Sequence, residues 1–193
     1  MTVIRAFIAI DLTPEIRQRV DQIAGEFQKR LTGVPVRWVP ADNIHVTLKF
    51  LGDVSLTNLE ILQKILQTEA ANHHPFEFSA GGVGAFPGMR HPRVIWIGIE
   101  APPDLVNLQH GIETAMARLG YAREERPFSA HLTLGRVSRN ISSRDMQSIS
   151  NVIETSKVGF LGVAHADLVH LFRSDLKPGG AVYTRIFSAT LKP

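Results

Sequence analysis

The chain has 193 residues, of which 44% are hydrophobic and 20% are charged, and its formal net charge is +3. This composition is typical of a soluble globular protein and is far from that of a histone-like polycation. Cysteine is absent, which excludes disulfides, thiolate metal sites and a cysteine nucleophile. No segment approaches the roughly 20 apolar residues of a membrane-spanning helix, and residues 1–20 are typical of a strand and a helix instead of a signal peptide. We therefore expect a cytoplasmic protein without a membrane partner.

The first half of the chain predicts alternating strands and helices. Thr13 and Pro14 are typical of a helix cap and a first helical turn, and apolar residues then recur at a spacing of three to four. Gly33 and Pro35 end this helix. In chain order, the expected elements are a strand at 4–12, a helix from 14 to about 31, a short strand near 36–39, a strand at 44–52, a helix at about 57–71 and a strand at 76–86.

The same order of elements then begins again. The segment VIWIGIEAPPDLVNLQHGI matches AFIAIDLTPEIRQRVDQI in kind, because each has an apolar strand, an acidic residue, a proline and then a helix. The expected elements are a strand at 93–100, a helix ending near Gly120, a short strand before the turn at 126–130, a strand at 131–137, a helix at about 142–156, a long strand within 160–174 and a strand at 181–191.

This internal repeat predicts an α+β fold. We expect a bilobal, pseudo-twofold, duplicated architecture, in which two mostly antiparallel sheets line a central cleft and the helices cover the outer faces. Residues 1–193 would form a single domain of two interleaved lobes, with approximate sequence repeats at 1–90 and 91–193.

The pattern His-x-Thr-Leu occurs once in each half: residues 45–52 read HVTLKFLG and residues 131–137 read HLTLGRV. Alternate side chains of a strand share one face of the sheet. We therefore expect His45, Thr47 and Lys49 on one face of their strand. The opposite faces of the two strands would pack into the core through Val46, Leu48, Phe50, Leu132 and Leu134.

The second copy places His131 and Thr133 on one face in the same way. Pseudo-twofold symmetry would bring the two polar faces together across a groove, so that two imidazoles and two hydroxyls converge. Displacement at phosphorus needs a base for the nucleophile and an acid for the leaving oxygen, and histidine serves as either near neutral pH. Threonine hydroxyls donate hydrogen bonds to phosphate oxygens. Neither motif has the additional ligands of a metal site.

The two motifs resemble the signatures of the 2H phosphoesterase superfamily. The flanking segments RWVPADNIHVTLKFLGDV, VGAFPGMRHPRVIWIGIE, RPFSAHLTLGRV and LFRSDLKPGGAVYTRI are similar to one branch, the RNA 2′,3′-cyclic phosphodiesterases, also called 2′-5′ RNA ligases. The resemblance covers essentially the whole chain in order, and neither motif departs from the pattern.

The resemblance implies metal-independent hydrolysis of a terminal RNA 2′,3′-cyclic phosphate to a 2′-phosphomonoester without a cofactor, and it allows reversible 2′-5′ RNA ligation in the same site. It implies that His45 is the proton donor and His131 the proton acceptor, while Thr47 and Thr133 hold phosphate oxygens. The two motifs are nearly alike, so the residues themselves do not distinguish the acid from the base.

The substrate implied is RNA with a 2′,3′-cyclic phosphate or 2′-phosphate end, such as a tRNA half, bound by a monomer. Aromatic stacking and cationic contacts commonly bind splayed nucleotides. Arg126, Phe128 and Arg136 flank the second motif and are the candidate substrate-binding residues. Two other functions stay open: a non-catalytic RNA-end binding protein, and a 2H phosphodiesterase acting on a small cyclic nucleotide.

Overall fold

The computed structural model describes residues 2–178 and 180–192. The strands are β1 (Val3–Ile10), β2 (Val36–Trp38), β3 (Val46–Ser55), β4 (Phe76–Phe86), β5 (Val94–Glu100), β6 (His131–Val137), β7 (Phe160–Ala166), β8 (Leu168–Lys177) and β9 (Gly180–Thr190). The helices are α1 (Pro14–Arg30), α2 (Leu59–Ala70), α3 (Pro103–Arg118) and α4 (Ser143–Thr155), with short 3-10 turns η1 (Ala41–Asn43) and η2 (Leu56–Asn58).

The helix ends follow local sequence signals. At the start of α1, the Thr13 hydroxyl accepts a hydrogen bond from the Ile16 backbone N–H at 3.4 Å, and Pro14 occupies the first turn. Such a cap satisfies one of the backbone donors that a helix start leaves free. The chain reverses after this helix at Gly33, whose φ of +83° is a conformation that glycine adopts readily. The predicted start and end of α1 are confirmed.

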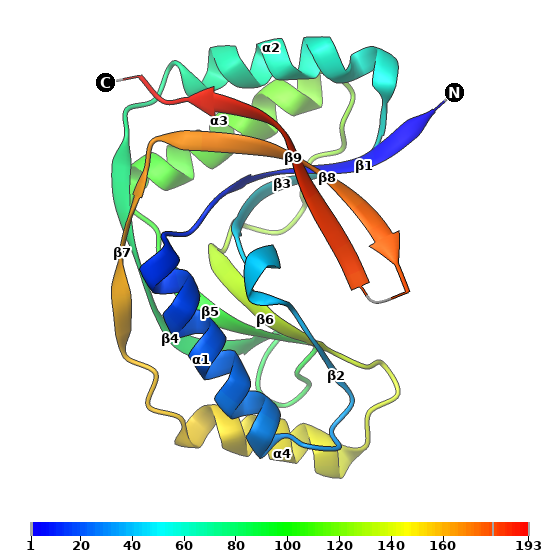
Figure 1. Cartoon of the computed structure of the whole chain (residues 1–193), viewed down its shortest axis with the longest axis vertical. Helices are drawn as coiled ribbons and strands as arrows, with labels where there is room; N and C mark the ends of the chain where they lie inside the picture. Colours follow the sequence, from blue (N-terminus) through cyan, green and yellow to red (C-terminus); the bar gives the residue numbers. More distant parts are fainter. Residues whose placement is uncertain (1, 179, 193) are drawn as a thin grey trace.

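The strands form two antiparallel sheets, a four-stranded sheet in the order β3-β1-β8-β9 and a five-stranded sheet in the order β2-β6-β5-β4-β7 (Figure 1). Each sheet combines strands from both halves of the chain, because β4 joins the five-stranded sheet and β8 joins the four-stranded sheet. The four strands β6-β5-β4-β7 of the second sheet correspond in position, one for one, to the strands β3-β1-β8-β9 of the first. The predicted α+β fold with two antiparallel sheets is confirmed.

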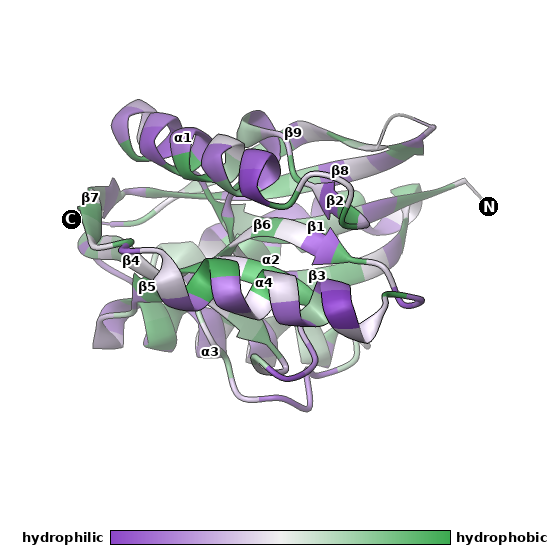
Figure 2. Ribbon diagram, turned by 90° about the horizontal axis from the view of Figure 1, so that it is seen from below, coloured by the Kyte–Doolittle hydropathy of each residue, from purple (hydrophilic) through white to green (hydrophobic). Residues whose placement is uncertain are grey.

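The helices cover the outside of the sheets and one large apolar core lies beneath them. Figure 1 shows α2 and α3 together at one end of the molecule and α4 at the other. In Figure 2, hydrophilic and hydrophobic residues alternate along the helical ribbons, as expected for helices that bury one face. On α3, the buried face contains one charged residue, Glu113, among aliphatic side chains.

Both His-x-Thr strands contain a β-bulge at the leucine of the motif. Leu48 is the extra residue in β3, because the residues on either side of it, Thr47 and Lys49, pair with consecutive residues of β1. Leu134 is the extra residue in β6, because its two neighbours pair with consecutive residues of β5. A bulge of this kind reverses the facing of the side chains that follow it.

The bulge makes two of the sequence expectations wrong. Lys49 does not share the face of His45 and Thr47; it points into the interior and is 5% exposed. Phe50 does not pack into the core and is 63% exposed. Strict alternation would have held without the extra residue, and the sequence does not reveal where a bulge occurs. In β6 the same reversal leaves Arg136 exposed.

Two further elements differ from the expectation. The long strand within 160–174 is divided at Asp167 into β7 and β8, which belong to different sheets. The short strand expected before the turn at 126–130 is absent, and residues 119–130 form an irregular loop. Hydrogen bonds from side chains hold the backbone of this loop, which pairs with no neighbouring strand.

The close approach of Trp96 to Gly84 across β4 and β5 gives a test of the packing. A Cβ at Gly84 would lie 2.4 Å from Trp96 Cζ2, whereas a Cβ at Gly25 within α1 would meet no atom within 4 Å. We expect Gly84→Ala to lower the free energy of unfolding by about 1–3 kcal/mol through overpacking. Gly25→Ala, the control, should raise it by about 0.5–1 kcal/mol because alanine favours a helix. Chemical denaturation measures both, and equal stability of the two variants would contradict the packing.

Candidate active site

His45 is enclosed by aromatic side chains of the four-stranded sheet. Its ring stacks on Phe7 with centroids 4.6 Å apart and an interplanar angle of 20°, and Phe7 stacks in turn on Phe172 at 5.2 Å. Tyr183 meets the His45 ring edge-on at 5.4 Å. Burial in this cluster lowers the pKa of His45 from 6.5 to about 4, because the charged imidazolium loses its hydration.

Asp11 is the acidic group that opposes this effect. Its charge raises the pKa of His45, as does a hydrogen bond to the Asn43 backbone. Asp11 pairs with Arg185, and His170 Nε2 lies 3.8 Å from the same carboxylate oxygen. The other ring nitrogen of His170 is 2.9 Å from the hydroxyl of a serine on β9. The sequence analysis placed neither Asp11 nor His170 in the site.

His131 has its ring oriented by the backbone that precedes it. Its Nδ1 lies 2.7 Å from the Ser129 carbonyl oxygen, and because a carbonyl only accepts, Nδ1 carries the hydrogen and donates it. The neutral ring therefore has an unprotonated Nε2, which is able to accept a proton. Phe86 meets the ring edge-on at 4.9 Å. Burial lowers the pKa of His131, the Ser129 hydrogen bond raises it and the charge of Arg136 lowers it.

The two motifs lie near each other. Residues of β3 come within 8 Å of residues of β6, measured between Cα atoms. The charge of Arg136 lowers the pKa of both His45 and His131. The backbone two residues earlier raises the pKa of each histidine by hydrogen bonding, at Asn43 for His45 and at Ser129 for His131. Thr47 and Thr133 are both half-buried at the corresponding places of their strands.

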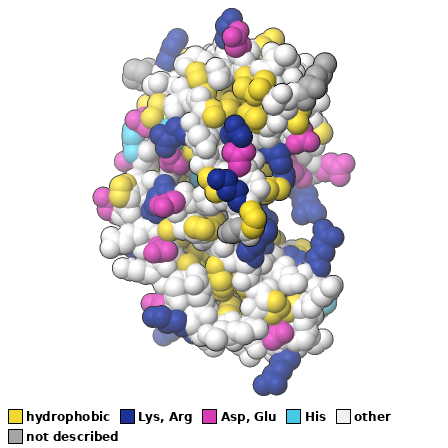
Figure 3. Space-filling view, turned by 45° about the vertical axis from the view of Figure 1, so that its right-hand side comes forward, with side chains coloured by type: hydrophobic (Ala, Val, Ile, Leu, Met, Phe, Trp, Pro, Cys, Tyr) yellow, Lys and Arg dark blue, Asp and Glu magenta, His cyan; other side chains and the backbone are white. Residues whose placement is uncertain are grey.

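The three candidate substrate-binding residues lie in different surroundings. Arg136 is exposed beyond the bulge of β6 and faces Arg37 across the pairing with β2. Arg126 is exposed in the irregular loop, where its backbone N–H donates to Glu124. Phe128 is half-buried and packs against the main core. Figure 3 shows Lys and Arg side chains around a hollow at the right-hand edge of the molecule.

Phe50 is an aromatic residue that the sequence analysis assigned to the core. It pairs with Phe7 across the β3–β1 ladder, and the two ring centroids are 6.0 Å apart. Residues paired directly across two antiparallel strands share one face of the sheet. Phe50 therefore lies on the same face as the aromatic cluster around His45. Strict alternation of side chains along the strand predicts the opposite face, toward the core, for Phe50.

Within residues 2–178 and 180–192, no group of three or more His, Asp or Glu side chains is arranged to hold a metal ion. Over the same residues, no helix combines the length and the apolar character required to span a bilayer.

Comparison with known proteins identifies the class and then the family. Residues 10–96 match the family described as LigT like phosphoesterase, and the structure of E. coli LigT complexed with 3′-AMP aligns with a TM-score of 0.76 at 27% identity over 100% of both chains. The RNA 2′,3′-cyclic phosphodiesterase of Methanothermobacter thermautotrophicus is 33% identical over 181 residues, 94% of this chain and 95% of that protein. That of Archaeoglobus fulgidus is 33% identical over 93% of this chain and 96% of that protein. The chain belongs to this family of enzymes, the RNA 2′,3′-cyclic phosphodiesterases.

The lowered pKa of His45 predicts a pH-dependent stability. Between pH 6.5 and about 4 the unfolded chain binds a proton at His45 that the folded chain does not, so folding stability falls as the pH falls through this range. We expect His45→Phe, which keeps an aromatic ring without titrating, to flatten this fall by up to about 3 kcal/mol. Denaturation at a series of pH values measures it. The exposed His110→Asn is the control, and an equal effect in both variants would contradict the burial of His45.

Proposed function

We propose that this protein hydrolyses terminal 2′,3′-cyclic phosphates of RNA to 2′-phosphates, with His45 as proton donor and His131 as proton acceptor. The observation that carries the proposal is the pair of equally bulged His-x-Thr strands, whose histidines both lie within the electrostatic influence of Arg136. The family of the chain and its similarity to E. coli LigT, solved with 3′-AMP, support a nucleotide-derived substrate.

In the proposed reaction, water attacks the phosphorus of the cyclic diester while His131 Nε2 takes its proton. The bond between phosphorus and the 3′ oxygen breaks, and His45 donates a proton to that oxygen. The free Nε2 of His131 suits this role because its Nδ1 is bonded to Ser129. The product is a 2′-phosphomonoester with a free 3′ hydroxyl, and 2′-5′ ligation would be the same displacement with the 5′ hydroxyl of a second RNA end in place of water.

A proton donor must be protonated before it acts, and burial opposes this at His45. Two charges favour the imidazolium in the complex: the Asp11 carboxylate and the negative charge of the bound phosphodiester. An anion placed next to a histidine raises the pKa of that histidine. Substrate binding would thus raise the pKa of His45 toward the working pH.

The remaining groups would bind the phosphate and the nucleotide. Thr47 and Thr133 would donate hydrogen bonds to the non-bridging oxygens, and Arg136 would offset their charge. Phe50, exposed and aromatic, offers a stacking surface for a base, in addition to the candidate substrate-binding residues Arg126 and Phe128. The substrate would be an RNA end, such as a tRNA half, bound by a monomer in the cytoplasm.

The test is a short RNA with a 2′,3′-cyclic phosphate, incubated with the protein in excess EDTA, followed by identification of the product isomer. We expect a 2′-phosphate and no requirement for a divalent ion. Binding of the RNA without turnover would favour a non-catalytic end-binding protein. Turnover of a free cyclic nucleotide alone would favour a small-molecule phosphodiesterase, and a 3′-phosphate product would contradict the assignment of the leaving oxygen.

Replacement of either histidine should remove most of the activity. His45→Ala and His131→Ala should each reduce the rate about 10²–10⁴-fold, the usual contribution of a general acid or base. The exposed His110→Ala serves as the control and should retain the wild-type rate. Single-turnover kinetics with the cyclic-phosphate RNA measures the loss. A histidine whose replacement leaves the rate unchanged has no part in proton transfer.

The threonines separate catalysis from binding. Thr47→Val and Thr133→Val keep the β-branched shape and remove a hydroxyl, so the fold should survive. We expect each to raise the barrier by about 2–4 kcal/mol, by analogy with an oxyanion-hole donor. The loss should appear mainly in kcat and less in RNA affinity, because the hydrogen bonds strengthen as charge builds on the phosphate. Normal cleavage by both variants would show that the hydroxyls do not hold the phosphate.

A further inference from the structure

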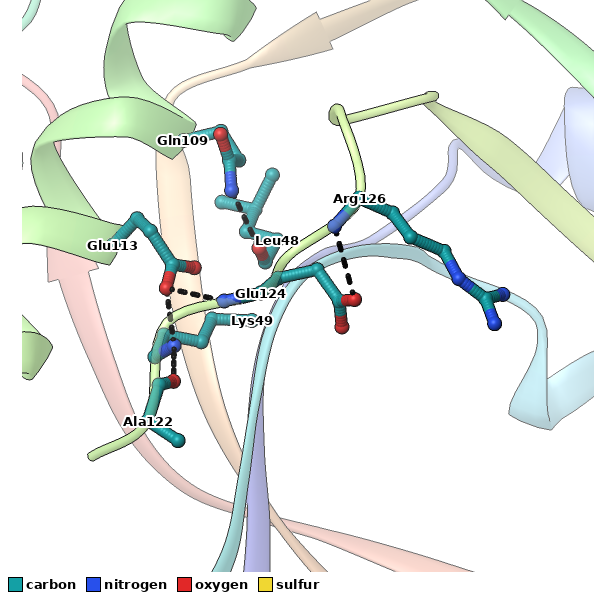
Figure 4. Close-up of polar contacts among 7 residues, drawn as sticks. All are labelled: Leu48, Lys49, Gln109, Glu113, Ala122, Glu124 and Arg126. Atoms are coloured by element: carbon teal, nitrogen blue, oxygen red, sulfur yellow. Dashed lines mark hydrogen bonds and ion pairs between the residues drawn. The ribbon is translucent and has the colours of Figure 1, made fainter.

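Lys49 and Glu113 form a buried ion pair between the first motif and α3. Lys49 Nζ lies 2.6 Å from Glu113 Oε1, and the two residues are 5% and 7% exposed. The bulge at Leu48 is what turns Lys49 inward to reach α3. The Leu48 carbonyl in turn accepts a hydrogen bond from the Gln109 side chain of α3 at 3.4 Å. Figure 4 shows these contacts side by side.

The same pair holds the irregular loop that leads to the second motif. Lys49 Nζ donates to the Ala122 carbonyl at 2.8 Å, and Glu113 Oε1 accepts from the Glu124 backbone N–H at 3.0 Å. Ala122 and Glu124 are themselves exposed, and they pair with no strand because the loop has no regular secondary structure. In Figure 4 the Arg126 side chain points away from the ion pair. Two buried charges therefore fix the backbone of an exposed segment.

This segment leads directly to the ring of His131. The loop continues from Glu124 to Ser129, whose carbonyl accepts the Nδ1 hydrogen of His131 at 2.7 Å. The place of that carbonyl depends on the path of the loop, since the loop is tied to the protein near its start and joins β6 at its end. The tautomer that leaves Nε2 free thus depends on a backbone that Lys49 and Glu113 hold.

Stability alone does not account for a charged pair at this position. Apolar residues of similar volume often replace a buried ion pair without loss of stability. Glu113 Oε2 is also buried and has no hydrogen-bond partner among the described residues, which is an added cost. Apolar side chains, however, could not bind both a carbonyl and an N–H of the loop.

We propose that Lys49 and Glu113 are positioning residues for His131: the pair anchors the loop at Ala122 and Glu124 and thereby keeps the His131 ring in the tautomer with a free Nε2. Through this anchor the strand of the first motif sets the geometry of the second. The catalytic consequence rests on the proposed function, whereas the anchoring and the tautomer do not.

The main test compares the wild type with the double variant Lys49→Met/Glu113→Leu, which removes both charges together and keeps the interior filled. Trypsin cleavage at the Arg123–Glu124 bond should become at least about tenfold faster, because a loop that is no longer anchored by the ion pair opens more often and then fits the active site of the protease. The ¹⁵N shifts of His131 should change from a single Nδ1–H tautomer to a mixture. The kcat for cyclic-phosphate RNA should fall about tenfold while the melting temperature stays close to that of the wild type.

A second variant pair leaves the ion pair intact, so the test does not depend on the double variant folding. Glu124→Pro removes the backbone N–H that Glu113 binds, and Glu124→Ala keeps it. We expect the tautomer mixture and the lower kcat in Glu124→Pro alone. Glu69→Gln, which alters a carboxylate of α2 that pairs with His73 beyond the end of the helix, is the control for any loss of a glutamate charge.

The outcomes separate the two proposals. A wild-type tautomer in both the double variant and Glu124→Pro, together with wild-type tryptic cleavage in the double variant, would overturn the positioning role. A changed tautomer and faster cleavage in a protein that hydrolyses no cyclic phosphate would support the anchor and overturn the proposed function. A loss of stability alone, with unchanged kcat and tautomer in the folded fraction, would show that the pair is merely structural.

Discussion

One extra residue in each of two strands determines what faces the candidate site. The bulges at Leu48 and Leu134 leave a histidine and a threonine on one face and turn the next residue toward the interior. In β3 that residue is Lys49, whose charge is matched by α3. In β6 it is Gly135, where a Cβ would lie 2.7 Å from Val36 Cγ1 of β2. The bulge therefore turns a charged side chain into the interior in β3, whereas in β6 it places a glycine where a side chain would meet β2.

The residue after each inward-facing position makes the two sides of the site unlike each other. It is the aromatic Phe50 in β3 and the cationic Arg136 in β6, and both are exposed. The acidic group Asp11 lies on the His45 side, where it pairs with Arg185 of β9. Two similar motifs thus acquire different electrostatic surroundings. The proposed roles of His45 as proton donor and His131 as proton acceptor rely on this difference, because the motifs themselves are nearly alike.

The sequence predicted those features that depend on local patterns. Capping residues and apolar spacing located α1, and the repeated motif identified His45 and His131 as a pair. Features that depend on partners distant in the chain were not accessible in this way. The inward orientation of Lys49 follows from the register between β3 and β1. The division of the strand at Asp167 follows from the pairing of its two parts, β7 and β8, with different sheets. The network of Asp11 and His170 joins a strand end to the last hairpin, and no spacing rule connects them.

The exchange of strands between the sheets has a consequence for how the chain acquires its structure during synthesis. β1 and β3 are translated early, but the strand that covers the other edge of β1 is β8, near the carboxyl end. Until β8 emerges from the ribosome, the edge of β1 has unpaired backbone groups, and such edges are prone to aggregation. Contacts between residues far apart in sequence also slow folding. The nascent protein thus carries an unpaired edge of β1 until its last hairpin is released, and a truncation before β8 would remove two of the four strands of that sheet while leaving all five strands of the other.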